Sequence, residues 1–136
     1  MADESLPKSA LERPRLLVVD DDAAICRSYR RMFSSGYDVE MEQSAVAALE
    51  RIGAGERFDV VISDLSMPVM SGAELHVRVQ AIDSQQADRM LFVTGSGYDE
   101  FSRTFLAGLT GRWLQKPFDA NALRALVAQL AASRRV

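Results

Sequence analysis

Five side chains suited to metal or phosphoryl chemistry lie at the ends of short, mostly apolar runs of the chain: Asp20, Asp21, Asp64, Thr94 and Lys116. If these runs are parallel strands of one sheet, their carboxyl ends meet at one rim. Three carboxylates at one rim repel each other unless a cation neutralises them. Oxygen-only ligands favour Mg²⁺, since zinc and copper sites usually include histidine or cysteine.

The same rim has the groups that phosphoryl transfer needs. Catalysis of this reaction is largely positioning and neutralisation of charge, which a lysine, a hydroxyl and a magnesium ion provide. A carboxylate can act as the nucleophile and form an aspartyl phosphate. Asp64 suits that role better than Asp20 or Asp21, because it lies alone at the end of its strand. The rim therefore predicts magnesium-dependent phosphorylation of Asp64.

The elements that must position these residues alternate along the chain. Strands are predicted at 16–19, 37–41, 58–62, 90–93 and 112–115, and helices at 25–33, 45–52, 75–82, 101–109 and 123–130. This alternation predicts an α/β fold, a doubly wound five-stranded parallel sheet with five helices. The first, third and fourth strands are apolar throughout, as central strands are, whereas the second and fifth carry polar residues. The expected order is 2-1-3-4-5, which is flavodoxin-like.

Length and composition indicate one domain. We expect a flexible N-terminal lead-in at 1–14 and the domain at 15–133. The net charge of −3 gives no basic footprint for direct binding of nucleic acid. A single cysteine, Cys26, excludes an internal disulfide and suits a reducing compartment. No secretory signal or membrane-spanning run is visible, so a cytoplasmic location away from the membrane is expected.

Four motifs resemble the receiver domain of two-component response regulators, over about residues 16–130. They are Leu-Val-Val-Asp-Asp-Asp at 17–22, Val-Ile-Ser-Asp-Leu-Ser-Met-Pro at 61–68 with Met-Ser-Gly at 70–72, Val-Thr-Gly at 93–95 and Gln-Lys-Pro-Phe at 115–118. Any one of them is weak evidence. All four occur in the family's order, each at a predicted strand end.

The resemblance implies a role for each residue at the rim. Asp64 would be the phosphoacceptor, and the cofactor would be magnesium. Asp21 and Asp64 would bind the ion directly, Asp20 would bind it through a water molecule, and the backbone carbonyl of Ser66 would complete the protein ligands.

The resemblance also implies the parts of a conformational switch. Thr94 would hydrogen-bond the phosphoryl group, and Lys116 would form a salt bridge to it. The Lys116–Pro117 peptide bond would be cis. Trp113 falls where the family has a tyrosine or phenylalanine that turns inward after phosphorylation. We hypothesise that the missing side chain at Gly95 makes room for the larger indole.

Partners follow from the same resemblance. The donor would be a histidine kinase or a phosphotransfer protein, and a downstream protein would read the change of shape. The surface of the fourth helix, fifth strand and fifth helix would dock that target or form a homodimer. The chain would be an acceptor in bacterial signal transduction and not an enzyme that turns over an external substrate.

Other functions remain open at this point. The chain resembles receivers attached to hybrid histidine kinases at residues 105–127, and a degenerate receiver that only binds partners is another alternative. A haloacid dehalogenase-like phosphatase is disfavoured, because Ala24 replaces the usual threonine or valine and the late acidic motif is missing. A flavin or nucleotide site is disfavoured by three aspartates where phosphate would bind. His76 is interpreted as an ordinary surface or boundary histidine without a partner.

Overall fold

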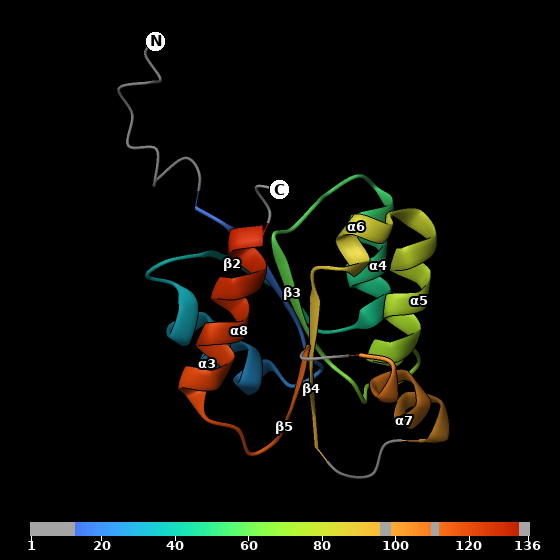
Figure 1. Cartoon of the computed structure of the whole chain (residues 1–136). Helices are drawn as coiled ribbons and strands as arrows, with labels where there is room; N and C mark the ends of the chain where they lie inside the picture. The colour runs from blue at the N-terminus through green and yellow to red at the C-terminus, as the bar shows by residue number, and fades with distance from the viewer. Residues whose placement is uncertain (1–12, 96–98, 110–111, 134–136) are drawn as a thin grey trace.

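A five-stranded parallel sheet forms the centre of the molecule in the computed structural model, which describes residues 13–95, 99–109 and 112–133. The strand order β2-β1-β3-β4-β5 confirms the predicted topology (Figure 1). Residues 1–12 of the predicted lead-in lie outside the described ranges. The strands are β1 (Arg15–Val19), β2 (Asp38–Glu42), β3 (Val60–Asp64), β4 (Met90–Thr94) and β5 (Trp113–Gln115).

Six helices occur in the described part of the chain, where five were predicted. They are α3 (Ala23–Phe33), α4 (Ala45–Gly53), α5 (Gly72–Ile82), α6 (Ser84–Ala87), α7 (Glu100–Ala107) and α8 (Ala120–Ala132). The additional helix, α6, begins because extended Asp83 ends α5 and its carboxylate accepts the backbone N–H groups of Gln85 and Gln86. One turn is too short for a helical period to appear in the sequence. None of the described helices has the length and apolar character that a membrane span requires.

Two hydrophobic clusters lie on opposite faces of the sheet. Leu17 and Val19 of β1 pack toward α4, α5, α6 and α7, whereas Leu16 and Val18 pack toward α3 and α8. Figure 1 shows the same division, with α3 and α8 on one side of the sheet and the other helices opposite. Because side chains alternate between faces along a strand, a strand covered on both sides must be apolar at every position. That requirement explains the unbroken apolar runs of β1, β3 and β4.

Side chains at the helix N-termini determine where each loop ends. The caps are Asp22, Ser44, Ser71, Asp83, Asp99 and Asp119. Each accepts a hydrogen bond from an otherwise unpaired N–H of the first turn, which commonly contributes about 1 kcal/mol. Ser71 and Glu74 form a reciprocal capping box at the start of α5.

An ion-pair network joins β1, β2 and the end of α4. Arg15 pairs with Glu40 and Glu56, at 2.6 and 3.0 Å, and Arg51 pairs with the same two glutamates. Both guanidinium groups also lie over the Phe58 ring. Arg51 also pairs with Glu42, the last residue of β2, at 3.2 Å, so the network holds the edge strand β2 along its length.

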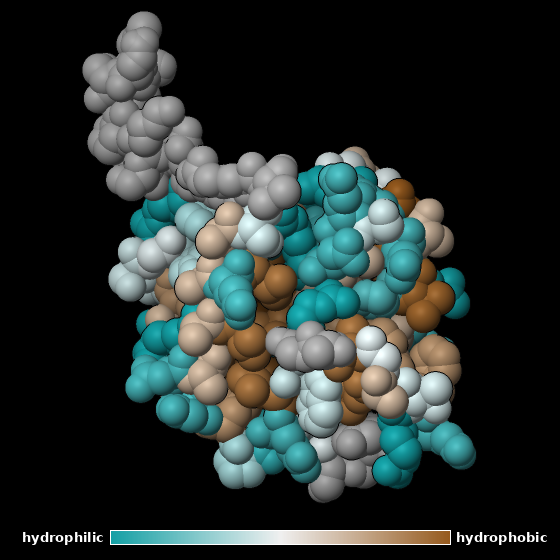
Figure 2. Space-filling model, viewed as in Figure 1, coloured by the Kyte–Doolittle hydropathy of each residue, from teal (hydrophilic) through white to brown (hydrophobic). Residues whose placement is uncertain are grey.

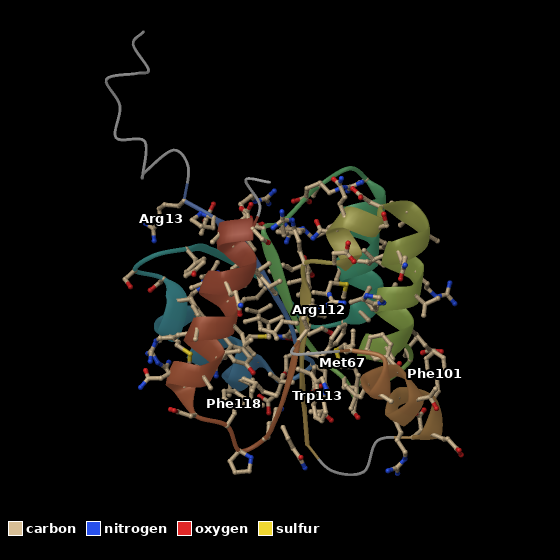
Figure 3. All side chains as sticks on the ribbon, viewed as in Figure 1. Arg13, Met67, Phe101, Arg112, Trp113 and Phe118 are labelled. Atoms are coloured by element: carbon tan, nitrogen blue, oxygen red, sulfur yellow. The ribbon has the colours of Figure 1, made fainter. Side chains whose placement is uncertain are left out.

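Strand β5 is the other edge of the sheet, with α7 and α8 on either side (Figure 1). Trp113 is half-buried against the cluster on the α7 side, and Leu114 and Phe118 are half-buried against the cluster on the α8 side. Figure 2 shows apolar side chains at the surface on both sides of this strand, and Figure 3 locates Trp113 and Phe118 there. This face therefore has more apolar surface than an ordinary solvated edge.

The loop between β3 and α5 contains a strained turn. Val69 has a φ of +72°, and the N–H of Met70 donates to the carbonyl of Pro68 at 2.8 Å. This is a γ-turn with positive φ, a rare and strained conformation, and it is especially unfavourable for a β-branched residue. The side chain of Val69 is 94% exposed, so packing of this side chain does not compensate for the strain.

The substitution Val69→Asn is expected to raise the free energy of unfolding by about 1 kcal/mol, because asparagine tolerates positive φ and little burial is lost. Urea unfolding monitored by circular dichroism would measure the change. The matched control is Val77→Asn, at a 52% exposed helical position of α5 where no such strain exists. A decrease in stability for Val69→Asn would contradict the assignment of strain to this turn.

Candidate functional site

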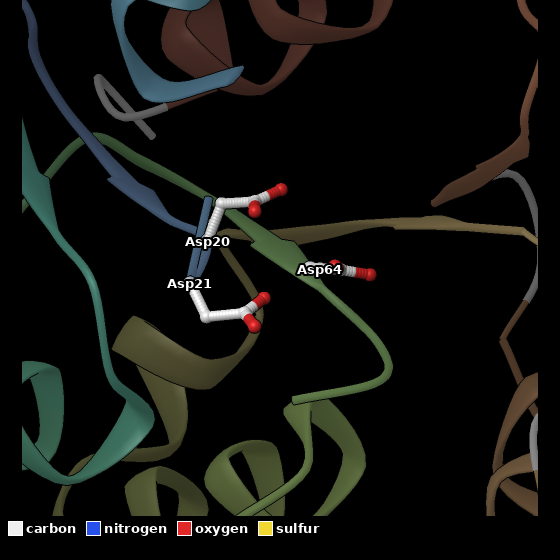
Figure 4. A group of neighbouring side chains, drawn as sticks. All are labelled: Asp20, Asp21 and Asp64. Atoms are coloured by element: carbon white, nitrogen blue, oxygen red, sulfur yellow. The ribbon is translucent and has the colours of Figure 1, made fainter. Parts of the chain in front are cut away.

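Three carboxyl groups converge beyond the ends of β1 and β3. Asp20 and Asp21 follow the last residue of β1, and Asp64 is the last residue of β3. Val19 pairs with Ser63, so Asp20 and Asp64 lie at the same level of two adjacent strands. One carboxylate oxygen from each aspartate lies within 4.8 Å of the others (Figure 4). The structure thus brings together the three predicted acidic residues.

Asp20 is the most deeply buried member of this acidic cluster, with 1% of its surface exposed. Its Oδ1 accepts the N–H of Asp22 at 2.9 Å, whereas its Oδ2 is buried and has no hydrogen-bond partner among the described residues. Burial, with the nearby charge of Asp64, raises the pKa of Asp20 to about 6. A buried carboxylate oxygen without a donor is unfavourable. A hard cation coordinated by oxygen would relieve that cost, so the residues fit a magnesium ion.

Asp64 is half-buried and Asp21 is exposed, so the cluster opens to solvent on one side. Burial raises the pKa of Asp64, and the positive charge of Lys116 opposes that shift. The N–H of Ser66 donates to Oδ1 of Asp64 at 3.3 Å. Asp64 therefore combines an accessible carboxylate with nearby groups that stabilise negative charge.

Gly72 allows the loop after β3 to fold closely against the end of that strand. Its N–H donates to the carbonyl of Leu65 at 2.8 Å. A Cβ at this position would lie 2.3 Å from the carbonyl oxygen of Asp64, so any other residue would force the loop to move. The hydroxyl of Ser63 also donates to the Asp64 carbonyl at 2.9 Å. These contacts fix the backbone that carries Asp64.

Thr94 and Lys116 come from the ends of β4 and β5. Thr94 pairs with Gln115, and the N–H of Lys116 donates to the Thr94 carbonyl at 2.7 Å. The positive charge of Lys116 opposes the rise in the pKa of both Asp20 and Asp64, so the ammonium group acts on the acidic cluster. The buried hydroxyl of Thr94 donates to the carbonyl of Gly95 at 3.1 Å. It must leave this partner before it can donate to a group bound at Asp64.

Comparison with known proteins identifies the family to which this arrangement of residues belongs. The family model of the response regulator receiver domain matches residues 16–128. The chain belongs to this family. Receiver domains are phosphoacceptors of two-component signalling and generally bind Mg²⁺ in an acidic pocket, and this chain has a cluster of three aspartates at the corresponding edge of its sheet.

Relatives of this receiver domain include both regulators and kinases. The response regulator MprA of Mycobacterium sp. (strain KMS) is 37% identical over 122 residues, which are 87% of this chain and 49% of that protein. The sensor kinase CckA of Brucella abortus (strain 2308) is 34% identical over 117 residues, 85% of this chain and 12% of that protein. The chain thus spans half or less of the length of these relatives.

Solved structures agree on the fold. The response regulator StyR has 30% sequence identity and a TM-score of 0.74, with 90% of this chain and 63% of that chain covered. A response regulator receiver domain protein from Clostridium thermocellum has a TM-score of 0.77 at 24% identity, covering 90% and 97% of the two chains. The second comparison supports the fold alone.

Other expectations for the receiver domain have mixed outcomes. The Lys116–Pro117 peptide bond is cis, as predicted. A Cβ on Gly95 would meet nothing within 4 Å, so in this conformation the glycine is not needed to accommodate Trp113. The interpretation of His76 as a surface or boundary histidine without a partner is wrong, because it is buried between Phe92 and Phe105. Its position beside Leu75 and Val79 on the inner face of α5 was the available signal.

The affinity of the receiver domain for Mg²⁺ is expected to fall as the pH drops below about 6, because Asp20 then takes up a proton in the free protein. Calorimetric titration with MgCl₂ between about pH 5 and about pH 8 would measure this dependence. Asp20→Asn should bind more weakly at the higher pH and show a flatter dependence. Asp38→Asn, at an exposed position at the other end of the sheet, should behave as the wild type.

Without metal, the linkage for Asp20 destabilises the fold as the pH rises. The folded protein still holds a proton between the ordinary pKa of 3.8 and about 6, whereas the unfolded chain has released it. Over this range the wild type should therefore lose stability with rising pH relative to Asp20→Asn. An identical pH dependence in the two metal-free proteins would contradict the raised pKa of Asp20.

Proposed function

We propose that the domain at 15–133 accepts a phosphoryl group from a histidine kinase or phosphotransfer protein onto Asp64, and signals by a change of conformation. In this reaction a carboxylate oxygen of Asp64 forms a bond to phosphorus while the bond from phosphorus to the donor imidazole nitrogen breaks. The released imidazole then takes up a proton. The observation that carries the proposal is the convergence of three carboxylates with the charge of Lys116 at the carboxyl ends of the strands.

The metal ligands in this proposal come from the acidic cluster. Asp21 and Asp64 would bind Mg²⁺ directly, Asp20 would bind it through a water molecule, and the carbonyl of Ser66 would complete the set. When bound, the ion would neutralise charge on the transferring phosphoryl group. The unpartnered Oδ2 of Asp20 supports this set, since it faces no donor in the described part of the protein.

Lys116 and Thr94 would act on the phosphoryl group after it arrives. The ammonium group of Lys116 would form a salt bridge to a phosphoryl oxygen, a charge-assisted contact that is stronger than a neutral hydrogen bond. The hydroxyl of Thr94 would exchange the Gly95 carbonyl for another phosphoryl oxygen. These contacts exist only in the phosphorylated state, so they would shift the equilibrium between inactive and active conformations.

The change would reach a partner through the surface of α7, β5 and α8. Apolar side chains lie on both sides of β5 on this surface (Figure 2), and Phe101 on the outer side of α7 is 50% exposed (Figure 3). Contiguous exposed apolar surface is typical of protein interaction sites. A downstream protein or a second copy of the chain would dock here, and neither nucleic acid nor membrane is required.

Two biological settings fit this acceptor. One is a cytoplasmic bacterial response regulator, and the other is a receiver attached to a hybrid histidine kinase. The similarity to the sensor kinase CckA, over 12% of its length, is compatible with the second without favouring it. In both settings the domain would accept a phosphoryl group and would not turn over an external substrate.

Incubation with acetyl phosphate and MgCl₂ is expected to add one phosphoryl group, detected by intact-protein mass spectrometry. The added mass should require magnesium and should be lost in Asp64→Asn. The matched control Asp38→Asn keeps Asp64 and should be phosphorylated as the wild type. No added mass at short times and low temperature, where an acyl phosphate survives, would instead indicate a degenerate receiver that acts by binding alone.

Trp113 fluorescence is expected to change on phosphorylation, because we propose that this ring turns inward as Thr94 moves toward the phosphoryl group. The chain has one tryptophan, so the signal reports this residue alone. Gly95→Val should reduce the fluorescence change while phosphorylation, measured by mass, continues. Unchanged wild-type fluorescence at full phosphorylation would contradict the coupling between Thr94 and Trp113.

A further inference from the structure

His76 lies in a cluster of rings that joins three elements of the fold. It projects from α5, is 8% exposed, and has ring-centroid distances of 5.9 Å to Phe92 of β4 and 5.1 Å to Phe105 of α7. Phe92 and Phe105 also contact each other edge to face at 5.0 Å. Trp113 pairs in register with Phe92 on the neighbouring strand. This cluster therefore connects α5 to α7 beside the strand that ends in Thr94.

The imidazole of His76 is suited to this cluster only when it is neutral. Its Nε2 is buried and has no hydrogen-bond partner in the described part of the chain. In a neutral ring this nitrogen can be a bare acceptor, which is a modest cost. In a protonated ring the same nitrogen would carry an N–H donor and part of a full charge, both buried among phenylalanine rings. Protonation would therefore favour a conformation in which the ring reaches water.

The charges around His76 strengthen this preference. Arg112 donates through Nη1 to the carbonyls of Ala87, Asp88 and Met90, at 3.2, 3.0 and 3.3 Å, so its guanidinium is fixed beside the end of α6. Burial and then the positive charge of Arg112 lower the pKa of His76, while the Asp88 carboxylate and the Ala87 carbonyl oppose that shift.

The helices on either side of the ring also carry charged residues, and all of these are exposed. They are Glu74 and Arg78 on α5 and Glu100 and Arg103 on α7.

The attachment of α7 makes it the element that would respond. Only Ser102 and Leu106 of this eight-residue helix are buried, and Phe105 is half-buried. Loss of the contact between Phe105 and His76 would remove a large fraction of its packing. By contrast, α5 is held by several buried residues and by its capping box.

We propose that His76 is a pH-sensitive latch, which holds α7 against α5 and β4 while its ring is neutral and releases α7 when the ring is protonated. The latch acts on the unphosphorylated protein. Its consequence for signalling rests on the proposed function, because α7 forms part of the proposed docking surface. Mild acid would then loosen that surface without a phosphoryl group at Asp64.

Hydrogen exchange measured by mass spectrometry on the unphosphorylated full chain would test the latch. After correction for intrinsic rates, exchange of peptides covering 100–107 is compared at two pH values, one pH unit below the ordinary histidine pKa of 6.5 and well above it. Exchange should be faster at the lower pH, by up to about tenfold. His76→Leu keeps an apolar side chain and removes the titration, so the acceleration should vanish in that variant. It leaves the pH response of Asp20 and Asp64 in place, which separates the latch from the acidic cluster.

Proton NMR of the imidazole gives an independent reading, because the chain has one histidine. The ring should titrate below 6.5 in the folded protein. Titration at or above that value would overturn the proposal, as would equal acceleration of 100–107 in wild type and His76→Leu. None of these measurements depends on phosphorylation, so failure of the latch and failure of phosphoacceptance at Asp64 are distinguishable.

Discussion

Repulsion between buried carboxylates at one rim of the sheet is the constraint on which the site depends. Burial raises the pKa of both Asp20 and Asp64, and a neighbouring carboxylate raises each further, Asp64 acting on Asp20 and Asp21 acting on Asp64. This arrangement does not stabilise the folded domain, because folding brings carboxylates together that repel each other. The charge of Lys116 and a bound cation offset the repulsion. The same charges that disfavour the site without a counter-ion would therefore favour the binding of a hard cation there.

The surrounding structure holds this unfavourable cluster in position. Parallel pairing places the ends of β1 and β3 at the same level, and apolar residues on both faces prevent either strand from slipping. Close approach at Gly72 fixes the carbonyl of Asp64, and the strained turn at Val69 lies in the same loop. Local strain of this kind persists only where neighbouring packing over-determines the backbone.

Sequence patterns were sufficient for the sheet and for the acidic cluster. Unbroken apolar runs identified the central strands. The aspartates at the ends of the first and third strands must lie at the same rim if the sheet is parallel. The patterns could not reveal α6, which is one turn long and depends on the carboxylate of Asp83. Nor could they reveal the turn at Val69, since valine gives no sign of positive φ. The burial of His76 follows from its position beside Leu75 and Val79 on the inner face of α5, whereas its ring partners Phe92 and Phe105 are distant in sequence.

The alternation of side chains along β4 connects the rim to the ring cluster. Thr94 and Phe92 are two residues apart, so they point to the same face of the strand, the face that α7 covers. Trp113 of β5 lies beside Phe92 of β4. Phe105 and His76 pack against the Phe92 ring from α7 and α5. The contacts of this ring cluster would thus respond to two events. One is a movement of Thr94 toward a phosphoryl group, and the other is protonation of His76. In that arrangement the two inputs are thermodynamically linked, because each changes the free energy of the same packed state of α7.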